Sequence, residues 1–311
     1  MSQAKVEVKE SKVKVEIKKS NKKSKSKHGL AYWAFVGPSL FAFSLVVLIP
    51  LILGIYYSFT NWNGIGSNVE WVGFKNYIKV FNDEGFRNSL WFTVKFTIVS
   101  VISINVIAFF LALLVTRESK ISNLLRTIFF MPNLIGGLIL GFIWQFIFVN
   151  VFNAVGQALG QEWMMGWLSN STTGFWGIVI IMAWQMAGYV MVIYIAGLQN
   201  VPQELNEAAK IDGANAWQRI KLITFPMIRP SFTISLFLTL SNSFKLFDQN
   251  LALTNGGPGN ATQMLALNIY QTAFSYNKMN LAQAKAVIFF VFVCIITLVQ
   301  VYMTKKDEVE V

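Results

Sequence analysis

Six long apolar segments constrain the fold of this chain more than any other feature of its sequence. Each supplies roughly the 20 residues that an α-helix needs to cross the hydrocarbon core of a bilayer. Because the bilayer core has no water to satisfy backbone N–H and C=O groups, these segments are predicted to be helices. With hydrophobic residues at 54% of 311, the chain is predicted to be an all-α polytopic membrane protein. The six predicted transmembrane helices are Ala31–Ser58, Leu90–Val115, Leu124–Val149, Phe175–Leu198, Ser231–Leu253 and Ala284–Thr304.

The distribution of lysine and arginine predicts the orientation, because short cytoplasmic segments carry an excess of these residues. Ten lysines precede the first span, and basic residues also follow the second, fourth and sixth spans. The segment between the third and fourth spans has Glu162 as its single charged residue. Both termini and residues 200–230 are therefore predicted to be cytoplasmic.

Composition divides the chain into four parts. Residues 1–30 are expected to form a disordered, Lys-rich cytoplasmic tail, which accounts for most of the net charge of +11. Such a tail favours contact with anionic membrane lipids over nucleic acid, so no nucleic-acid partner is expected. Residues 31–89 comprise the first transmembrane helix and an outer loop. Residues 90–304 form the core of five helices with its cytoplasmic loop 200–230, and residues 305–311 form a cytoplasmic C-terminus.

The chain lacks the residues that common enzymatic functions need. The chain has one histidine, His28, in the tail and one cysteine, Cys294, in an apolar segment where it packs as a small hydrophobe. No group of His, Cys, Asp or Glu has the spacing of a metal site. No Gly-x-x-x-x-Gly-Lys-Ser/Thr phosphate loop is present. We therefore expect no catalytic residues, bound cofactor or metal, and any energy for transport would come from a partner.

The loop 200–230 has a regular pattern that favours a docking surface. Pro202 is suited to start a short helix, in which Ala208–Ala209 would let another surface approach the backbone closely. Gly213 permits a sharp break, and a second short helix is expected to end at Pro226 and Pro230. The alternative is an amphipathic interfacial hairpin that only orients the spans.

The same loop resembles the Glu-Ala-Ala loop of ABC transporter permeases that depend on a binding protein. Glu207, Ala208 and Ala209 are followed after three residues by Gly213, and after nine more by Ile223-Thr224-Phe225-Pro226, where Phe225 replaces the family's leucine. In that family the loop docks into a cytoplasmic ATPase subunit. The resemblance thus implies ATPase-coupling roles for the following residues: Glu207, Ala208, Ala209, Gly213, Ile223 and Pro226.

A second pattern is similar to carbohydrate permeases. It comprises Phe247-Asp248, Leu253–Pro258 with Thr262 and Ile269-Tyr270 beyond, Gly73–Tyr77 and Ser58–Thr60, and the resemblance runs from about residue 30 to 303. It implies the type I (MetI-like) importer fold. It also implies a heterodimer with a second homologous permease, two ATPase subunits that use ATP, and an extracytoplasmic solute-binding protein. The chain would be a multi-pass protein of the bacterial inner (plasma) membrane that imports a sugar or oligosaccharide.

Polar residues mark the fifth predicted span. Thr239, Asn242, Ser243, Gln249 and Asn250 fall on one helical face, so this face is predicted to line the bundle interior or a wet cavity. Neutral donors and acceptors beside apolar surface suit sugar recognition. The alternative is interhelical hydrogen bonding that only holds the bundle together.

The resemblance implies further residues along the substrate path. The family's path positions match Asn133, Gly137, Gln185, Met186, Thr239 and Ser243, although several have changed chemical type. Gly136-Gly137 is equally explained by close helix packing.

Two charges in the fifth predicted span, Lys245 and Asp248, lie three residues apart and are predicted to form a buried ion pair, because a lone charge in the bilayer is costly. A proton relay is the alternative role for this pair. Other functions also stay open: import of glycerol phosphate, with Lys245 meeting the phosphate; a proton-coupled secondary carrier; and a passive channel or scaffold.

Overall fold

The computed structural model describes residues 32–66, 69–116 and 119–305. The predicted tail 1–30 and nearly all of the C-terminus 305–311 lie outside the described residues. The chain divides into two units, Met1–Tyr57 and Ser58–Val311, which are described separately.

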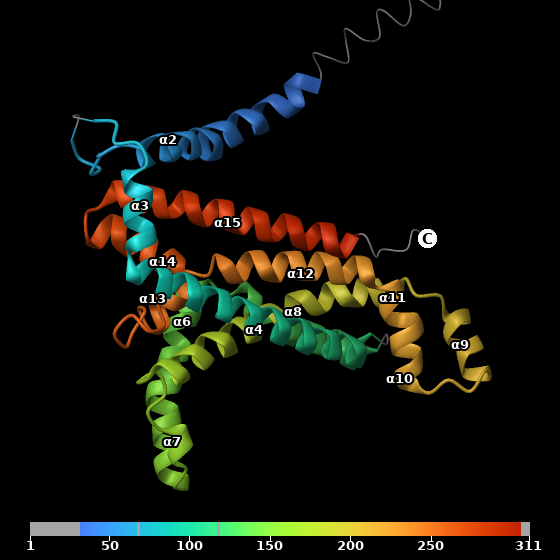
Figure 1. Cartoon of the computed structure of the whole chain (residues 1–311). Coiled ribbons are helices and arrows are strands. Elements are labelled where there is room, and N and C mark those ends of the chain that lie inside the picture. Colours follow the sequence, from blue (N-terminus) through green and yellow to red (C-terminus); the bar gives the residue numbers. More distant parts are fainter. Residues whose placement is uncertain (1–31, 67–68, 117–118, 306–311) are drawn as a thin grey trace, which may run out of the picture. The chain divides into compact units, whose positions relative to one another are not determined.

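The first unit contains the first predicted span. The helix Tyr32–Ser58 is interrupted by a π-helical turn, Ser44–Leu48, and continues as α2, Ile49–Ser58 (Figure 1). None of its most apolar stretch is buried by this chain, as expected for a helix surrounded by lipid or by another subunit. The predicted span is confirmed.

The second unit begins with the outer segment that leads into the core. An isolated bridge pairs Thr60 with Trp71, and the Asn76 amide donates to the carbonyl oxygens of Ser58 and Thr60, at 2.8 and 2.7 Å. These bonds hold α3, Lys75–Asn82, against the start of the unit.

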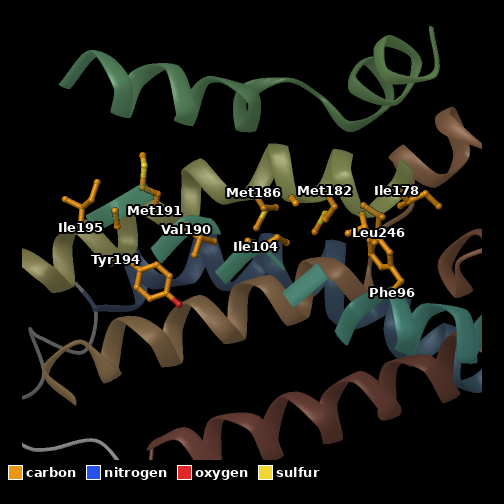
Figure 2. Close-up of a cluster of buried hydrophobic side chains, with 14 of the residues drawn as sticks. Phe96, Ile104, Ile178, Met182, Met186, Val190, Met191, Tyr194, Ile195 and Leu246 are labelled. Atoms are coloured by element: carbon orange, nitrogen blue, oxygen red, sulfur yellow. The ribbon is translucent and has the colours of Figure 1, made fainter. Parts of the chain in front are cut away.

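The rigid part of the second unit is a pair of long helices, α4 (Glu84–Val115) and α8 (Ser171–Gln199). Asp83 and Asn170 cap their N-termini through side-chain oxygens that accept backbone N–H groups. Figure 2 shows the apolar side chains that pack between them. The labelled residues are Phe96, Ile104, Ile178, Met182, Met186, Val190, Met191, Tyr194, Ile195 and Leu246. Both predicted spans are confirmed, each a few residues longer than expected.

The third predicted span, Leu124–Val149, is wrong as a single helix. A helix ends at Phe130, a 3-10 turn covers Met131–Leu134, and a new helix begins at Gly137. Pro132 has no N–H to continue the hydrogen-bond ladder, and Gly136 has the extended dihedrals φ −60 and ψ 141. The apolar stretch long enough to span is instead Gly137–Leu159. The helix before the break is α5 (Lys120–Phe130). The stretch after the break consists of α6 (Gly137–Phe146), a π-helical turn (Ile147–Val151) and α7 (Phe152–Leu159).

The fifth predicted span, Ser231–Leu253, is also broken. Helix α12 covers Arg229–Phe244, and a separate short helix, α13, covers Asp248–Leu253. Before α12 the chain bends by 74° between the helical segments Ala216–Met227 and Arg229–Phe244. Among the described residues, five helices are long and apolar enough to cross a membrane, or six if this bent pair is one span.

The last span lies at the end of the chain. Helix α14 (Leu265–Tyr270) continues as a π-helical turn, Gln271–Ser275, and α15 covers Met279–Lys305. The predicted span Ala284–Thr304 is confirmed, with a start five residues earlier. In Figure 1, α15 runs beside α12, and the two helices contact each other.

Candidate translocation cavity and cytoplasmic loop

The breaks in the third and fifth spans meet at a polar cavity of about 260 Å³. The end of α12, the break after it and the start of α13 together supply most of the lining, the middle of α8 supplies one wall, and α6 contributes its first residue. The lining residues are Gly137, Met182, Gln185, Met186, Asn242, Lys245, Leu246, Phe247, Asp248 and Gln249. We call this site the polar cavity.

Hydrogen bonds between the broken segments shape the polar cavity. The Gln185 amide donates to the carbonyl oxygen of Ile135 at 3.0 Å, and the Gln249 amide donates to the Gln185 side-chain oxygen. A Cβ atom on Gly137 would lie 2.8 Å from the Cβ of Asp248, so only glycine allows this approach. The polar cavity thus depends on three separate parts of the sequence that meet in space.

The predicted buried ion pair is not formed. Lys245 and Asp248 both line the polar cavity and are exposed in this chain, and no salt bridge joins them in the part of the chain that the structure describes. The helix ends at Phe244, and Phe247 has φ −128 and ψ −58, so the helical spacing assumed for the pair is absent. Lys245 and Asp248 therefore place opposite charges on one cavity wall without neutralising each other.

Three predicted path residues lie in the packed interior instead. Thr239 donates to the Ser235 carbonyl oxygen at 2.7 Å and accepts a bond from the Asn105 amide at 3.0 Å, and Tyr194 donates to Asn105 at 2.7 Å. Ser243 is fully buried beside them in α12. This favours the alternative that Thr239 ties helices together.

Asn250 is the third of these interior residues. It is also fully buried and holds the segment between α13 and α14 in place. Its amide donates to the Thr262 carbonyl oxygen at 2.8 Å, and its side-chain oxygen accepts the Met264 N–H at 2.9 Å. Asn133 is half-buried in the 3-10 turn and is not among the residues that line the polar cavity. The substrate-path role of these residues stays a prediction.

The cytoplasmic loop forms two short helices around Gly213, as predicted. Helix α9 (Gln203–Ile211) starts directly after Pro202, and Gly213 has φ +79, a conformation that L side chains rarely adopt. Asn215 and Gln218 form a capping box at the start of α10, Ala216–Arg219.

The second short helix does not end at Pro226, because a π-helical turn, Ile220–Thr224, leads into α11, Phe225–Met227. The bend of 74° comes after this helix, at Ile228. In the π-helical turn the N–H of Phe225 donates to the carbonyl oxygen of Ile220, five residues earlier.

Glu207 and Ala208 are exposed, and Ala209 is half-buried on the same short helix. Large apolar side chains of the loop are also exposed, among them Ile211 at 86% and Trp217 at 68%. An exposed apolar surface of this kind favours a protein partner. The coupling roles of Glu207, Ala208, Ala209, Gly213, Ile223 and Pro226 stay predictions.

Lys285, which lies inside the last predicted span, was not among the predicted site residues. Its side chain is 3% exposed, and its ammonium group binds Asp83 at 2.8 Å, Asn268 at 2.8 Å and Thr272 at 2.9 Å. This is the one salt bridge within the described residues. A lone lysine in an apolar segment is a costly feature, and that cost was the available signal.

The carboxyl group of Asp83 lies at the outer start of α4. Burial alone raises its pKa, but the hydrogen bond and charge of Lys285 and the N–H groups of Phe86 and Gly85 together outweigh burial. The net result is a pKa below the usual value of 3.8. The ion pair joins the start of α4 to α15, and the bonds of Lys285 to Asn268 and Thr272 add α14 and the π-helical turn after it.

Comparison with known families identifies the chain. Residues 104–306 match the family described as the inner membrane component of binding-protein-dependent transport systems. The chain belongs to this family. The permease is therefore a multi-pass membrane component of a transport system that works with a binding protein and other subunits, and not an enzyme.

Relatives of the permease are found among sugar transport systems. It is 57% identical to the probable starch degradation products transport system permease protein AmyD of Thermoanaerobacterium thermosulfurigenes, over 91% of this chain and 97% of the relative. It is 31% identical to the multiple sugar-binding transport system permease protein MsmF of Streptococcus mutans, over 89% and 96%.

The fold is similar to a solved bacterial ABC transporter that imports alginate. A chain of that transporter superposes with a TM-score of 0.77 at 20% identity, over 90% of this chain and 96% of the other. The importer-permease fold implied by the sequence is thus confirmed.

Proposed function

We propose that the permease is the membrane subunit of an ATP-driven importer for oligosaccharides, in particular the short α-linked glucose chains released from starch. The observation that carries the proposal is the 57% identity, over nearly the whole chain, with the permease of a probable system for starch degradation products. The polar cavity supports it, because amides of Gln185, Asn242 and Gln249 lie beside apolar Met182 and Met186. Neutral amides beside apolar surface are the groups that recognise sugars.

The importer assembles from several subunits in a bacterial inner membrane. A second homologous permease forms the other half of the path, two cytoplasmic ATPases bind and hydrolyse ATP, and an extracytoplasmic binding protein delivers the sugar. Both termini of the permease are cytoplasmic. This assembly is supported by the family match and by the exposed apolar side chains of the cytoplasmic loop.

Coupling takes place at the cytoplasmic loop. The exposed helix α9, with the small Ala208–Ala209 surface, docks into an ATPase subunit, and closure of the ATPases moves α9. The bent connection through α11 at Ile228 transmits this movement to α12, whose C-terminal end lines the polar cavity. The loop and the polar cavity are thus linked through one helix.

Reconstitution tests the proposal directly. The complete complex in proteoliposomes, supplied with its binding protein and with ATP inside, is expected to accumulate radiolabelled maltotetraose. Accumulation that survives ATP removal but collapses with the proton gradient would instead show a secondary carrier. Glycerol 3-phosphate serves as the second probe, because Lys245 in the polar cavity offers a positive charge to a phosphate. Preference for this probe would overturn the sugar proposal.

Matched glycine variants test the coupling step. Gly213 and Gly160 both have positive φ values, +79 and +65, and a Cβ on either meets nothing within 4 Å. Gly213→Val is therefore expected to abolish ATP-dependent uptake while the protein still inserts. Gly160→Val, with similar backbone strain far from the loop, is expected to retain uptake. Equal uptake in the two variants would contradict a coupling role for the loop.

A further inference from the structure

A second hollow of about 380 Å³ lies next to the polar cavity and shares Phe247 with it. Three aromatic rings lie along the polar cavity and this second hollow. The ring centroids of Phe247 and Tyr270 are 5.1 Å apart, and those of Tyr270 and Phe274 are 5.0 Å apart. We call Phe247, Tyr270 and Phe274 the aromatic ladder. Its first ring lines the polar cavity, and its other two rings lead away from it.

Local structure explains why the rings align. Tyr270 ends α14 and Phe274 lies four residues later in the π-helical turn, so both side chains project from one face. Opposite them, α15 presents Ala282 and Ala286, whose small side chains keep the hollow open. Tyr270 is 41% exposed and Phe274 62% exposed, so this chain leaves both rings uncovered.

The chemistry of the aromatic ladder matches that of a sugar. A pyranose ring has an apolar C–H face, which packs on an aromatic ring, and a hydroxyl edge, which needs hydrogen-bond partners. The aromatic ladder supplies rings, the Gln283 amide lies in the same hollow, and the path continues to the amides of Gln185 and Asn242. Apolar surface with a few convergent polar groups is typical of small-molecule sites.

We propose that Tyr270 and Phe274 are sugar-stacking sites that bind successive residues of an oligosaccharide as it enters the polar cavity. The inference rests on the proposed function and adds the residues that favour a chain over a single sugar. A lone sugar unit occupies one ring at a time, whereas an oligosaccharide contacts several rings together. The aromatic ladder thus selects for chain length.

Ring-removing variants of the assembled complex test this inference. Tyr270→Leu and Phe274→Leu keep an apolar side chain but remove the ring. With the binding protein present, each is expected to raise the KM for maltotetraose uptake roughly three- to ten-fold, the size of an aromatic contact. The KM for maltose is expected to change less, and kcat and basal ATP hydrolysis to stay near wild type.

Two controls separate stacking from a general packing effect. Tyr270→Phe keeps the ring and is expected to retain the wild-type KM. Phe142→Leu removes another exposed aromatic side chain, 58% exposed on α6, that lines neither hollow. It is expected to leave the uptake of both sugars unchanged.

Three outcomes would overturn the inference. An unchanged KM for maltotetraose in both Tyr270→Leu and Phe274→Leu would refute stacking while leaving the proposed importer intact. Reduced co-purification of the second permease with the leucine variants would show that the rings contact that subunit. Wild-type complex that accumulates neither maltose nor maltotetraose would refute the proposed function and, with it, this inference.

Discussion

The α4–α8 pair and the segments around the polar cavity both come from apolar sequence. The two helices of the pair are continuous, whereas the third and fifth spans, which meet at the cavity, are interrupted. Helices α4 and α8 run unbroken for 32 and 29 residues, and the buried Asn105 of α4 forms hydrogen bonds with Tyr194 of α8 and Thr239 of α12. The helices around the polar cavity stop and restart, at Met131–Gly136 and at Lys245–Phe247. Breaks of this kind free backbone groups and turn polar side chains toward open space, which the bilayer tolerates only where they line a cavity. The continuous pair is thus the scaffold, α8 supplies one wall of the polar cavity, and the broken helices supply the rest of its lining.

The largest effect is expected at Gly188, where the scaffold meets the first broken helix. A Cβ there would lie 1.8 Å from the Phe129 carbonyl oxygen, a clash with backbone that no side-chain rotation relieves. Gly188→Val is therefore expected to prevent stable folding, seen as loss of a monodisperse peak in detergent. Gly136→Ala is the control, because its Cβ would meet nothing within 4 Å. A well-folded Gly188→Val protein would show that α5 separates from α8 at little cost.

A smaller loss of stability is expected when the ion pair at the outer end of the scaffold is broken. Lys285→Met leaves the Asp83 carboxylate, Asn268 and Thr272 without their shared donor. Because Asp83 is 37% exposed, we expect a decrease in unfolding free energy of about 2–3 kcal/mol, below the range for fully buried pairs. Unfolding in a denaturing detergent would measure it, with the exposed Lys278→Met as control. Equal stability of the two variants would refute the structural role of Lys285.

Thr239 and Asn242 both lie on α12, and substituting each of them tests most directly the difference between the scaffold and the polar cavity. Thr239 is buried and bonded to Asn105, so Thr239→Val is expected to lower stability by about 1 kcal/mol and to leave the KM for sugar unchanged. Asn242 is exposed in the polar cavity and donates to the Leu238 carbonyl of its own helix. Asn242→Ala is expected to lower uptake several-fold with little change in melting temperature. The reverse pattern would show that the substrate path runs through the helix interface.

The smallest effect is a pH dependence of stability. The pKa of Asp83 is lower in the folded protein than its usual 3.8, so its carboxylate stabilises the fold above that value. The contribution is lost as pH falls through the folded pKa, because the protonated carboxyl no longer pairs with Lys285. Asp83→Asn should thus be less stable than wild type at pH 7, and the difference should shrink below pH of about 4. Melting temperatures across this range would measure it, and a constant difference would contradict the linkage.

Sequence reasoning succeeded where a structural property depends on neighbours along the chain. Hydropathy located the spans that became Tyr32–Ser58, α4, α8 and α15. The same reasoning placed the break in the cytoplasmic loop at Gly213, because a positive φ is a local preference of glycine.

Sequence reasoning failed where the third and fifth spans are interrupted. Pro132 lies inside the third predicted span and lacks the N–H that would continue a helix, so it was an available signal for that break. Nothing local marks Lys245–Phe247 as a break, because this segment is held by contacts such as those of α13 with α6.

For the candidate site too, sequence reasoning identified some residues correctly and misplaced others. A polar row on the fifth predicted span indicated a substrate path, and Asn242 and Gln249 of that row do line the polar cavity. Gln185, which the family resemblance suggested, lines it too. Thr239 and Asn250, from the same row, form hydrogen bonds inside the protein: Thr239 with Asn105, 134 residues away, and Asn250 with Thr262, 12 residues away. The aromatic ladder was not visible either, since Phe247 and Tyr270 are separated by α13 and the outer loop.

By itself the sequence determined that this chain is a bundle of helices in a bilayer. Its apolar segments are long enough to cross the bilayer, and a helix satisfies all backbone hydrogen bonds there. Its loop pattern also determined the family, which the comparisons confirmed. Only the tertiary structure decided which polar side chains form hydrogen bonds between helices and which line the polar cavity, where a solute could bind them. That choice depends on whether a distant segment supplies a hydrogen-bond partner, and no local pattern contains this information.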